Sequence, residues 1–149
     1  MKIEQEIKQS KFRNEYQKLF VNLIFTSKWL EVQASVFLKK FDLTQQQFNI
    51  LRILRGQYPK PSPVKLLVER MIDKQCDASR MVERLRLKGL VDRNECKSNR
   101  RQVDLMITDK GLALLDDIDL VQEQMDELLI NLTPVEAGKM NDMLDKIRG

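Results

Sequence analysis

The side chains best suited to recognition chemistry lie in two short segments of the chain, residues 74–84 and 97–101. Both segments are rich in arginine, lysine and small polar groups. A guanidinium donates several hydrogen bonds in one plane and matches phosphate oxygens or the O6 and N7 acceptors of guanine. Amide and hydroxyl groups can contact other base edges or the sugar-phosphate backbone. The candidate nucleic-acid contacts are Lys74, Gln75, Asp77, Ser79, Arg80, Arg84, Lys97, Arg100 and Arg101.

The same residues also have an interpretation that involves no ligand. Charged side chains on an exposed helix face commonly serve solubility, and Asp77 is well placed to be a helix N-cap. Arg100 and Arg101 would then only keep a turn soluble. Binding to duplex DNA at several salt concentrations separates the two interpretations, because only phosphate contacts give a steep salt dependence.

The composition argues against an enzyme. The chain has no histidine, which removes the commonest general base and a leading metal ligand. It also has no nucleophile elbow, phosphate-binding loop or paired metal motif. Asp116, Asp117 and Asp119 are expected at an exposed helix start, where negative charge favours the helix dipole. We therefore expect no catalytic residues, no metal and no cofactor.

The elements that must position the candidate contacts are a pair of helices and a hairpin. Val64–Arg70 is predicted to be a short helix, and Asp77–Lys88 is predicted to be a second helix that ends at Gly89. The residues that follow predict a two-stranded antiparallel ribbon with its turn at Ser98–Arg101. A helix of this size fits the major groove of DNA, and a basic hairpin can reach the backbone or an adjacent minor groove.

Long helices are predicted on both sides of this segment. Apolar residues recur with helical spacing over residues 3–40, 109–130 and 133–148. Ser62-Pro63 and Thr133-Pro134 each combine an N-cap with a proline at the first helical position. The long terminal helices have more apolar surface than the small central lobe can cover. We therefore expect two copies of the chain to interlock as a homodimer.

Charge is distributed unevenly along the chain. Residues 52–111 hold 15 basic and 8 acidic residues, a net charge of +7, whereas residues 1–51 carry +3 and residues 112–149 carry −6. The basic excess coincides with the helix pair and hairpin, where a polyphosphate partner would require it. The acidic C-terminal part should point away from DNA.

Other features of the sequence place few further limits on function. No apolar run approaches the roughly 20 residues that a bilayer span requires, and the polar residues 1–4 do not predict a secretory signal. Two cysteines, Cys76 and Cys96, are too few for a disulfide framework. We expect a cytoplasmic protein without a membrane partner.

Several motifs together resemble the MarR family of winged helix-turn-helix regulators over nearly the whole chain. Ser79–Leu85 followed by Lys88–Arg93 is similar to the family's recognition helix and its exit. Asn99–Gly111 resembles the Asp-x-Arg wing that ends in Leu-Thr-x-x-Gly, and Leu132–Glu136 resembles the start of the last helix. Two positions depart from the pattern. The wing aspartate, whose carboxylate helps to hold the wing arginine in the family pattern, is replaced by Asn99, and the leucine is replaced by Ile107.

The resemblance implies a mainly α-helical fold with a winged helix-turn-helix lobe, a two-stranded antiparallel wing and long terminal helices that form a dimerisation region. The expected divisions are residues 1–40 and 112–149 for dimerisation and residues 41–111 for DNA binding. A homodimer of this kind would occupy a pseudo-palindromic operator, with half-sites about one helical turn apart, and repress transcription. Its function would be that of a sequence-specific transcriptional regulator.

The family also suggests an effector. Its members often bind small aromatic or phenolic anions between the dimer helices and the DNA-binding lobe, and a bound ligand releases the operator. The residues that could line such a cavity here are Tyr16, Phe20, Phe25 and Trp29. Aromatic residues with helical spacing are more often part of an apolar core, so this assignment rests on the resemblance alone.

Two alternatives remain open on sequence grounds. Cys76 lies just before a helix N-terminus, a position that lowers a thiol pKa, and some family members sense oxidants through cysteine. Cys76, and to a lesser extent Cys96, could therefore make this a redox-sensing regulator. The other alternative is a winged-helix protein-interaction module that has lost DNA binding, which the charge of residues 52–111 argues against.

Overall fold

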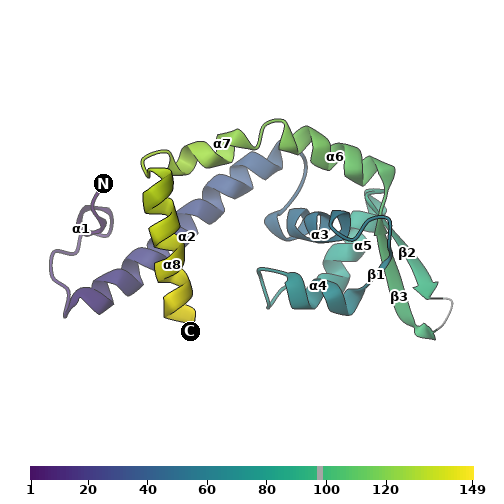
Figure 1. The fold of residues 1–149 in the computed structure, drawn as a ribbon, viewed down its shortest axis with the longest axis horizontal. Helices are drawn as coiled ribbons and strands as arrows, with labels where there is room; N and C mark the ends of the chain where they lie inside the picture. Colours follow the sequence, from purple (N-terminus) through teal and green to yellow (C-terminus); the bar gives the residue numbers. More distant parts are fainter. Residues whose placement is uncertain (97–98) are drawn as a thin grey trace. The chain divides into compact units, whose positions relative to one another are not determined.

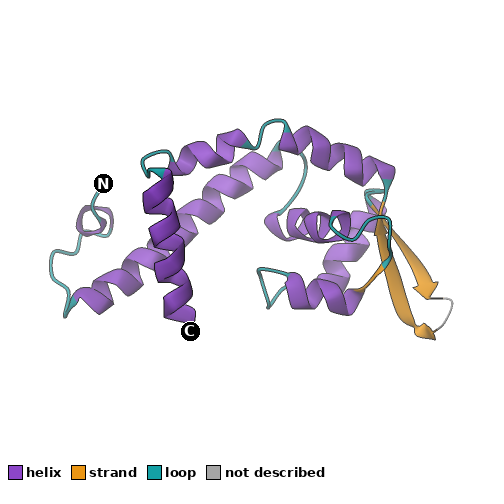
Figure 2. Cartoon of the chain, viewed as in Figure 1, coloured by secondary structure: helices purple, strands orange, loops and turns teal. Residues whose placement is uncertain are grey.

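The chain divides into two units, Met1–Gln45 and Gln46–Gly149. The computed structural model describes the backbone of residues 1–96 and 99–149 and the side chains of residues 1–94 and 103–149. Figure 1 gives the order of the elements, and Figure 2 shows that helices account for most of the chain and that the strands are confined to one small sheet.

The first unit contains a short helix and a long one, α1 (Ile3–Glu6) and α2 (Glu15–Lys39). The prediction of one continuous helix over residues 3–40 is therefore wrong. Asn14 explains the start of α2, because its side chain accepts a hydrogen bond from the Gln17 backbone N–H at 2.9 Å as an N-cap. The α1 segment folds back on α2 through an ion pair of 2.6 Å between Glu4 and Lys18.

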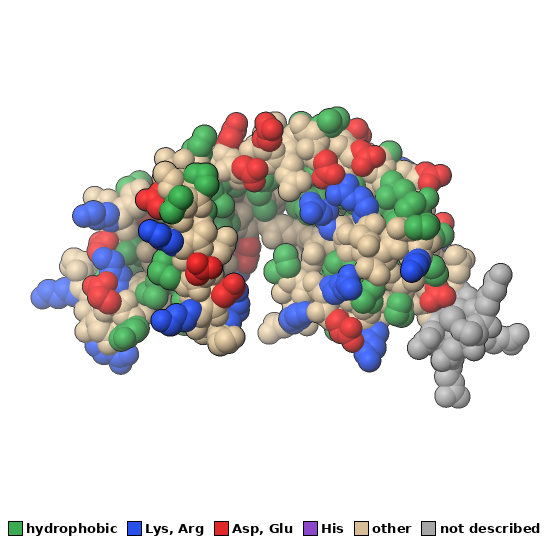
Figure 3. Space-filling model, in the orientation of Figure 1, with side chains coloured by type: hydrophobic (Ala, Val, Ile, Leu, Met, Phe, Trp, Pro, Cys, Tyr) green, Lys and Arg blue, Asp and Glu red, His purple; other side chains and the backbone are tan. Residues whose placement is uncertain are grey.

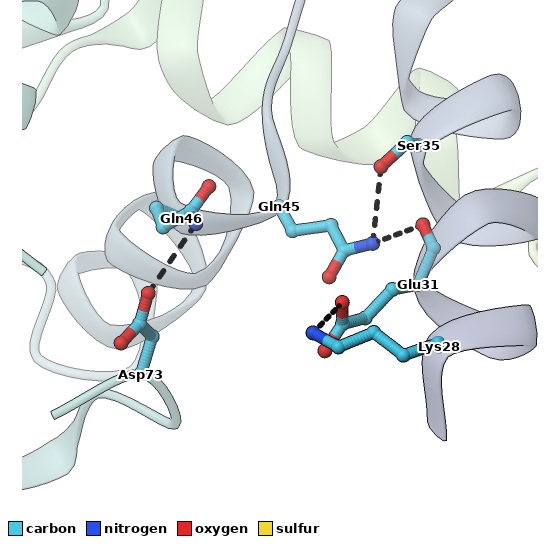
Figure 4. Close-up of polar contacts among 6 residues, drawn as sticks. All are labelled: Lys28, Glu31, Ser35, Gln45, Gln46 and Asp73. Atoms are coloured by element: carbon cyan, nitrogen blue, oxygen red, sulfur yellow. Dashed lines mark hydrogen bonds and ion pairs between the residues drawn. The ribbon is translucent and has the colours of Figure 1, made fainter. Parts of the chain in front are cut away.

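Gln45 is the last residue of the first unit, and its side chain is hydrogen-bonded to the long helix α2 of that unit. Its side-chain amide donates to the Glu31 carbonyl at 2.6 Å and to the Ser35 hydroxyl at 3.2 Å (Figure 4). Lys28 and Glu31 form an ion pair on the same stretch of α2, at 2.7 Å. These contacts fix the chain where it leaves the first unit.

The second unit holds the predicted helix pair, hairpin and C-terminal helices. In chain order its elements are α3 (Gln45–Arg55), which begins at the boundary, β1 (Ser62–Pro63), α4 (Val64–Arg70), α5 (Ala78–Leu87), β2 (Val91–Cys96), β3 (Asn99–Ile107), α6 (Asp109–Asp119), α7 (Glu123–Asp126), the 3-10 helix η1 (Glu127–Leu129) and α8 (Pro134–Arg148). The mainly α-helical, winged helix-turn-helix fold is confirmed.

The sheet is antiparallel with the strand order β1-β3-β2. Val91 pairs with Ile107 and Arg93 with Leu105, and the register shifts once near the end of the hairpin, between Glu95 and Cys96. The predicted two-stranded wing is present, and the short β1 adds a third strand beside Leu105. Ser62 belongs to this strand and is buried, so the prediction that it caps α4 is wrong; Pro63 holds that position.

The predicted hairpin turn is too long. Asn99 pairs with Cys96, and Arg100 and Arg101 lie within β3 at the register shift, so the turn predicted over residues 98–101 is wrong at residues 99–101. Lys97 and Ser98 lie outside the described residues.

The core of the second unit lies beneath the helix pair and the base of the wing. Its side chains are almost completely removed from water, which is the main stabilising contribution in a small domain. The most deeply buried are Ile50, Leu51, Leu54, Leu67, Met71, Val82, Leu85, Val91, Leu105, Ile107, Leu115 and Ile118.

The junction between α5, the wing and α6 depends on closely spaced backbone. Gly89 ends α5 with a positive φ of 72°, which glycine adopts without steric cost. Thr108 caps α6 and donates its hydroxyl to the Gly89 carbonyl at 2.8 Å. Gly111 lies so close to the wing that a Cβ atom there would be 2.5 Å from the Leu90 carbonyl oxygen and 2.7 Å from a side-chain carbon of Ile107.

The C-terminal helices differ from the prediction at one point. The continuous helix expected over residues 109–130 is wrong, because α6 ends at Asp119 and only the short elements α7 and η1 follow. Asp116, Asp117 and Asp119 therefore lie in the last turns of α6, not at a helix start. Negative charge opposes the helix dipole at that end, and this gives a physical reason for the break. Arg55 of α3 offsets part of the charge with an ion pair to Asp119 at 2.6 Å.

The last helix begins as predicted. Thr133 and Glu136 form a capping box, in which the Thr133 backbone N–H donates to the Glu136 carboxylate at 2.8 Å. This backbone hydrogen bond lowers the pKa of Glu136. None of the side chains of α8 is buried in the single chain, and Val135, Met143 and Ile147 are exposed.

The close approach at Gly111 predicts a clear effect of a single methyl group. Gly111→Ala should lower the free energy of unfolding by roughly 1–3 kcal/mol, because the Leu90 carbonyl is backbone and cannot move aside cheaply. Gly138→Ala is the matched control. Gly138 lies inside α8, and a Cβ atom added there would meet no atom within 4 Å, so alanine should stabilise the helix by about 0.5–1 kcal/mol. Urea unfolding at a fixed protein concentration measures both, and equal stability of the two variants would contradict this difference in packing.

Candidate nucleic-acid interface

Helix α5 presents two chemically different faces. Ala78, Val82 and Leu85 are buried in the second unit. Arg80 and Arg84 lie four residues apart and are exposed, so they share one side of the helix. Among the described residues, the guanidinium group of neither arginine forms a hydrogen bond or ion pair. As far as the described residues are concerned, both guanidinium groups are available to an external partner.

Asp77 begins this helix as an N-cap. Its carboxylate accepts a hydrogen bond of 3.0 Å from the Arg80 backbone N–H. The interpretation of Asp77 as a cap is thus what the geometry supports, and its carboxylate faces the helix start. Ser79, in the first turn of α5, is exposed.

Lys74 is engaged within the protein. Its ammonium donates to the Glu69 carbonyl at 2.6 Å and lies 3.5 Å from the Val68 carbonyl oxygen. Both carbonyls belong to the last turn of α4, so Lys74 caps that helix and places positive charge at its negative end. A DNA contact by Lys74 would have to share or replace these bonds. Its predicted role is therefore weaker than that of Arg80.

The turn between α4 and α5 is attached to α3 by two side chains. Asn49 accepts a hydrogen bond of 3.0 Å from the Ile72 backbone N–H, and Gln46 donates to the Asp73 carboxylate at 3.4 Å, the second of these being drawn in Figure 4. Asp73 in turn accepts the Gln75 backbone N–H at 3.0 Å. Sequence reasoning missed Gln46 and Asn49. Their spacing of three residues on one helix was a signal for a shared face, but their partners are far away in the sequence.

A second set of contacts links α5 to the wing. Glu83 binds Arg86 through two hydrogen bonds of 2.8 and 3.0 Å, and its carboxylate lies 4.0 Å from the Arg93 guanidinium on β2. The hydrogen bond from Arg86 lowers the pKa of Glu83, and the same bond raises the pKa of Arg86. The Glu83 carboxylate therefore offsets part of the positive charge of Arg86 and Arg93 within the protein. Glu83 was also missed, although a glutamate three residues before an arginine is a common helical pair.

The wing carries the remaining predicted contacts. Arg100 and Arg101 belong to β3, the long strand that pairs with both neighbours.

Figure 3 shows acidic side chains along the α6–α7 part of the second unit and basic side chains over α3–α5, as the charge distribution in the sequence predicts. This separation suits a polyanion at the helix pair.

The predicted aromatic effector residues all lie on α2. Tyr16, Phe20 and Trp29 are exposed, and Phe25 is half-buried. Exposed aromatic rings on a single copy of the chain are an unsatisfied apolar surface.

Cys76 lies in the turn before α5 and is half-buried. Burial raises the pKa of its thiol, and the carboxylates of Asp73 and Asp77 raise the pKa further. The lowered pKa that the position suggested is therefore not what its surroundings produce. Burial is the main cause of the raised pKa, and the two nearby carboxylates act in the same direction. The side chain of Cys96 lies outside the described residues.

Neither a metal cluster nor a membrane-spanning helix is found in the described part of the chain. It contains no group of three or more His, Cys, Asp or Glu side chains arranged to hold a metal ion. None of its helices is both long enough and apolar enough to cross a bilayer.

The chain is similar to known transcriptional regulators. No family model matches it. It is 25% identical over 130 residues to the HTH-type transcriptional regulator SarZ of Staphylococcus haemolyticus, a match that covers 80% of this chain and 87% of SarZ. The structure of a mutant MarR from E. coli complexed with operator DNA is 26% identical, with a TM-score of 0.79 and coverage of 93% of this chain and 99% of that one.

A second solved structure shares the fold. The organohalide-sensing regulator RdhR-CbdbA1625, in its 2,4-dichlorophenol-bound form, superimposes with a TM-score of 0.82 and 19% identity, over 94% of this chain and 85% of its own.

The surroundings of Cys76 predict a poorly reactive thiol. In a Cys96→Ser variant, the rate of Cys76 alkylation should rise with pH around a midpoint above that of an unstructured cysteine peptide. Asp77→Asn should move this midpoint downwards, because asparagine keeps the helix cap but removes one negative charge. The shift should be partial, since burial is the largest cause. A midpoint below that of the free peptide would contradict the structure.

Proposed function

We propose that this chain, a member of the MarR family of winged helix-turn-helix regulators by fold and by sequence, binds double-stranded DNA and regulates transcription. Helix α5 would enter the major groove, and the wing would reach the neighbouring backbone or minor groove. The observation that carries this proposal is the exposed face of α5, where Arg80 and Arg84 have no partner among the described side chains. Their neighbours Arg86 and Arg93 are already occupied by Glu83.

The candidate contacts have different expected roles. Arg80 is the most suitable base-reading residue, because it lies in the first turn of α5, where recognition helices contact base edges. Ser79 and Gln75 could contact bases or phosphates nearby. Arg84, Lys97, Arg100 and Arg101 would neutralise phosphates or enter a narrow minor groove, whose negative potential attracts arginine. Lys74 and Asp77 would act mainly as helix caps, at the end of α4 and the start of α5, and would thereby position the start of α5.

The active form would be a homodimer. Tyr16 and Phe20 on α2, and Met143 and Ile147 on α8, are exposed apolar residues of a single chain. A second copy could cover both helices, and the two α5 helices of a symmetric dimer would contact the two halves of a pseudo-palindromic operator. Residues 1–40 and 112–149 would then supply the dimer contacts and residues 41–111 the DNA contacts, all in the cytoplasm.

Repression and its release complete the proposal. A dimer that occupies a promoter would repress transcription, and a small aromatic or phenolic ligand would release it. Tyr16, Phe20, Phe25 and Trp29 are the candidate ligand contacts once a partner copy covers α2. Such a ligand can act only through a difference in its affinity for the two states of the dimer. The raised pKa of Cys76 does not favour a thiol switch in its place.

Selection of bound fragments from random duplex DNA is the direct test. Wild-type protein should enrich a pseudo-palindromic site. Arg80→Ala should weaken binding to that site by roughly 1–3 kcal/mol if Arg80 reads a base. Arg86→Ala is a matched control on the same helix, because the Arg86 charge is already paired with Glu83. Its binding should stay within about twofold to threefold of wild type. An equal loss in both variants would contradict the assignment of α5.

The dimer makes a separate prediction. Wild-type protein should sediment as a dimer, and Ile147→Glu should shift the population towards monomers, because burial of an unpaired carboxylate in an apolar interface is unfavourable. Tyr58→Glu, which changes an exposed apolar residue outside α2 and α8, is the control and should remain dimeric. Analytical ultracentrifugation measures both. A monomeric wild type would contradict the dimer.

A further inference from the structure

Ile72 is an unusually exposed apolar residue in the turn between α4 and α5. Its exposed fraction is 88%, whereas the preceding Met71 is buried at 2%. Isolated exposed apolar residues are common on protein surfaces, so exposure alone carries little weight. What distinguishes Ile72 is its position: the turn leads directly into the helix proposed to enter the major groove.

The backbone of this residue is held by a dedicated contact. The Ile72 N–H donates to the Asn49 side chain at 3.0 Å. The next residue, Asp73, accepts a hydrogen bond from Gln46 at 3.4 Å (Figure 4) and another from the Gln75 N–H at 3.0 Å. The turn is thus held by hydrogen bonds to α3 and by one hydrogen bond within the turn itself. A side chain on a fixed backbone loses less conformational freedom when it binds than one on a loose loop.

The surroundings of Ile72 are polar and carry charges of both signs, with Glu69 and Asp73 beside Arg70 and Lys74. Arg70, Lys74 and Gln75 are exposed on the same short segment. Lys74 adds positive charge at the end of α4. This combination suits a DNA surface, which offers phosphates together with one prominent apolar group in the major groove, the C5 methyl of thymine. If the partner of this segment were a protein, we would instead expect a larger apolar surface around Ile72 on this chain.

We propose that Ile72 is a specificity-determining contact of the DNA interface and that its side chain packs against a thymine methyl group in each half-site. This inference rests on the proposed function, and it adds an apolar contact to the polar set formed by Arg80, Ser79 and Gln75. Asn49 acts as a positioning residue, because it holds the backbone of Ile72 and has no role at the base itself.

Replacement of thymine by deoxyuridine tests this contact directly, because uracil lacks only the methyl group. Each thymine of the selected operator is replaced in turn, and dissociation constants are measured for wild type, Ile72→Val and Ile72→Ala. At one thymine in each half-site, the change should weaken wild type by about three- to tenfold. Ile72→Val keeps branched methyl groups and should respond similarly. Ile72→Ala should show no further loss at that thymine.

The experiment separates failure of this inference from failure of the proposed function. If wild type selects no duplex, both are wrong. If wild type selects a site but every thymine replacement affects wild type and Ile72→Ala equally, only the contact by Ile72 is wrong. A uniform loss by Ile72→Ala on selected and unselected duplexes would also overturn it, since that result marks a sugar-phosphate contact. Asn49→Ala should reduce the methyl effect while unfolding cooperatively, as a positioning role requires.

Discussion

The burial of Ala78, Val82 and Leu85 is the constraint on which the rest of the structure depends. A helix of this length is not stable alone in water, so α5 exists because this face packs into the second unit. Once these three residues point inwards, the helical repeat leaves Ser79, Arg80 and Arg84 outside. The same constraint therefore supplies stability and sets the direction of the groups that would meet a nucleic acid.

The contacts around α5 decide which of its charges remain available. Asp77 is used to start the helix, Glu83 binds Arg86 and approaches Arg93, and Lys74 caps the end of α4. The exposed ion pairs of Glu83 contribute little to stability on their own. The main effect of these contacts together is on geometry, since they hold the start of α5 and attach the wing to the helix pair, and they engage none of the side-chain charge of Arg80 and Arg84.

Local patterns predicted much of this arrangement. The N-caps at Asp77 and Thr133 and the end of α5 at Gly89 follow from short-range chemistry that the sequence displays directly. The prediction failed where helical spacing continued across a local signal. Asn14 offers a cap that interrupts the apolar periodicity of residues 3–40, and the aspartates at the end of α6 are unfavourable to its continuation.

The contacts that the sequence could not predict are those between distant segments. Asn49 and Ile72 are 23 residues apart, and nothing in either neighbourhood identifies the other. The environment of Cys76 also required the fold, because its pKa depends on burial and on the orientation of two carboxylates. Its position before a helix was a sound reason to expect a lowered thiol pKa, but burial, with the charges of Asp73 and Asp77, raises that pKa instead.

The most direct test of the central claim is the salt dependence of binding to duplex DNA. If α5 and the wing contact phosphates, the logarithm of the association constant should fall linearly with the logarithm of salt concentration, with a slope of about −0.9 for each phosphate neutralised. We predict a slope that corresponds to several phosphates and becomes shallower in Arg84→Ala. Binding that is absent in dilute buffer, or that does not change with salt, would contradict a nucleic-acid interface on this face.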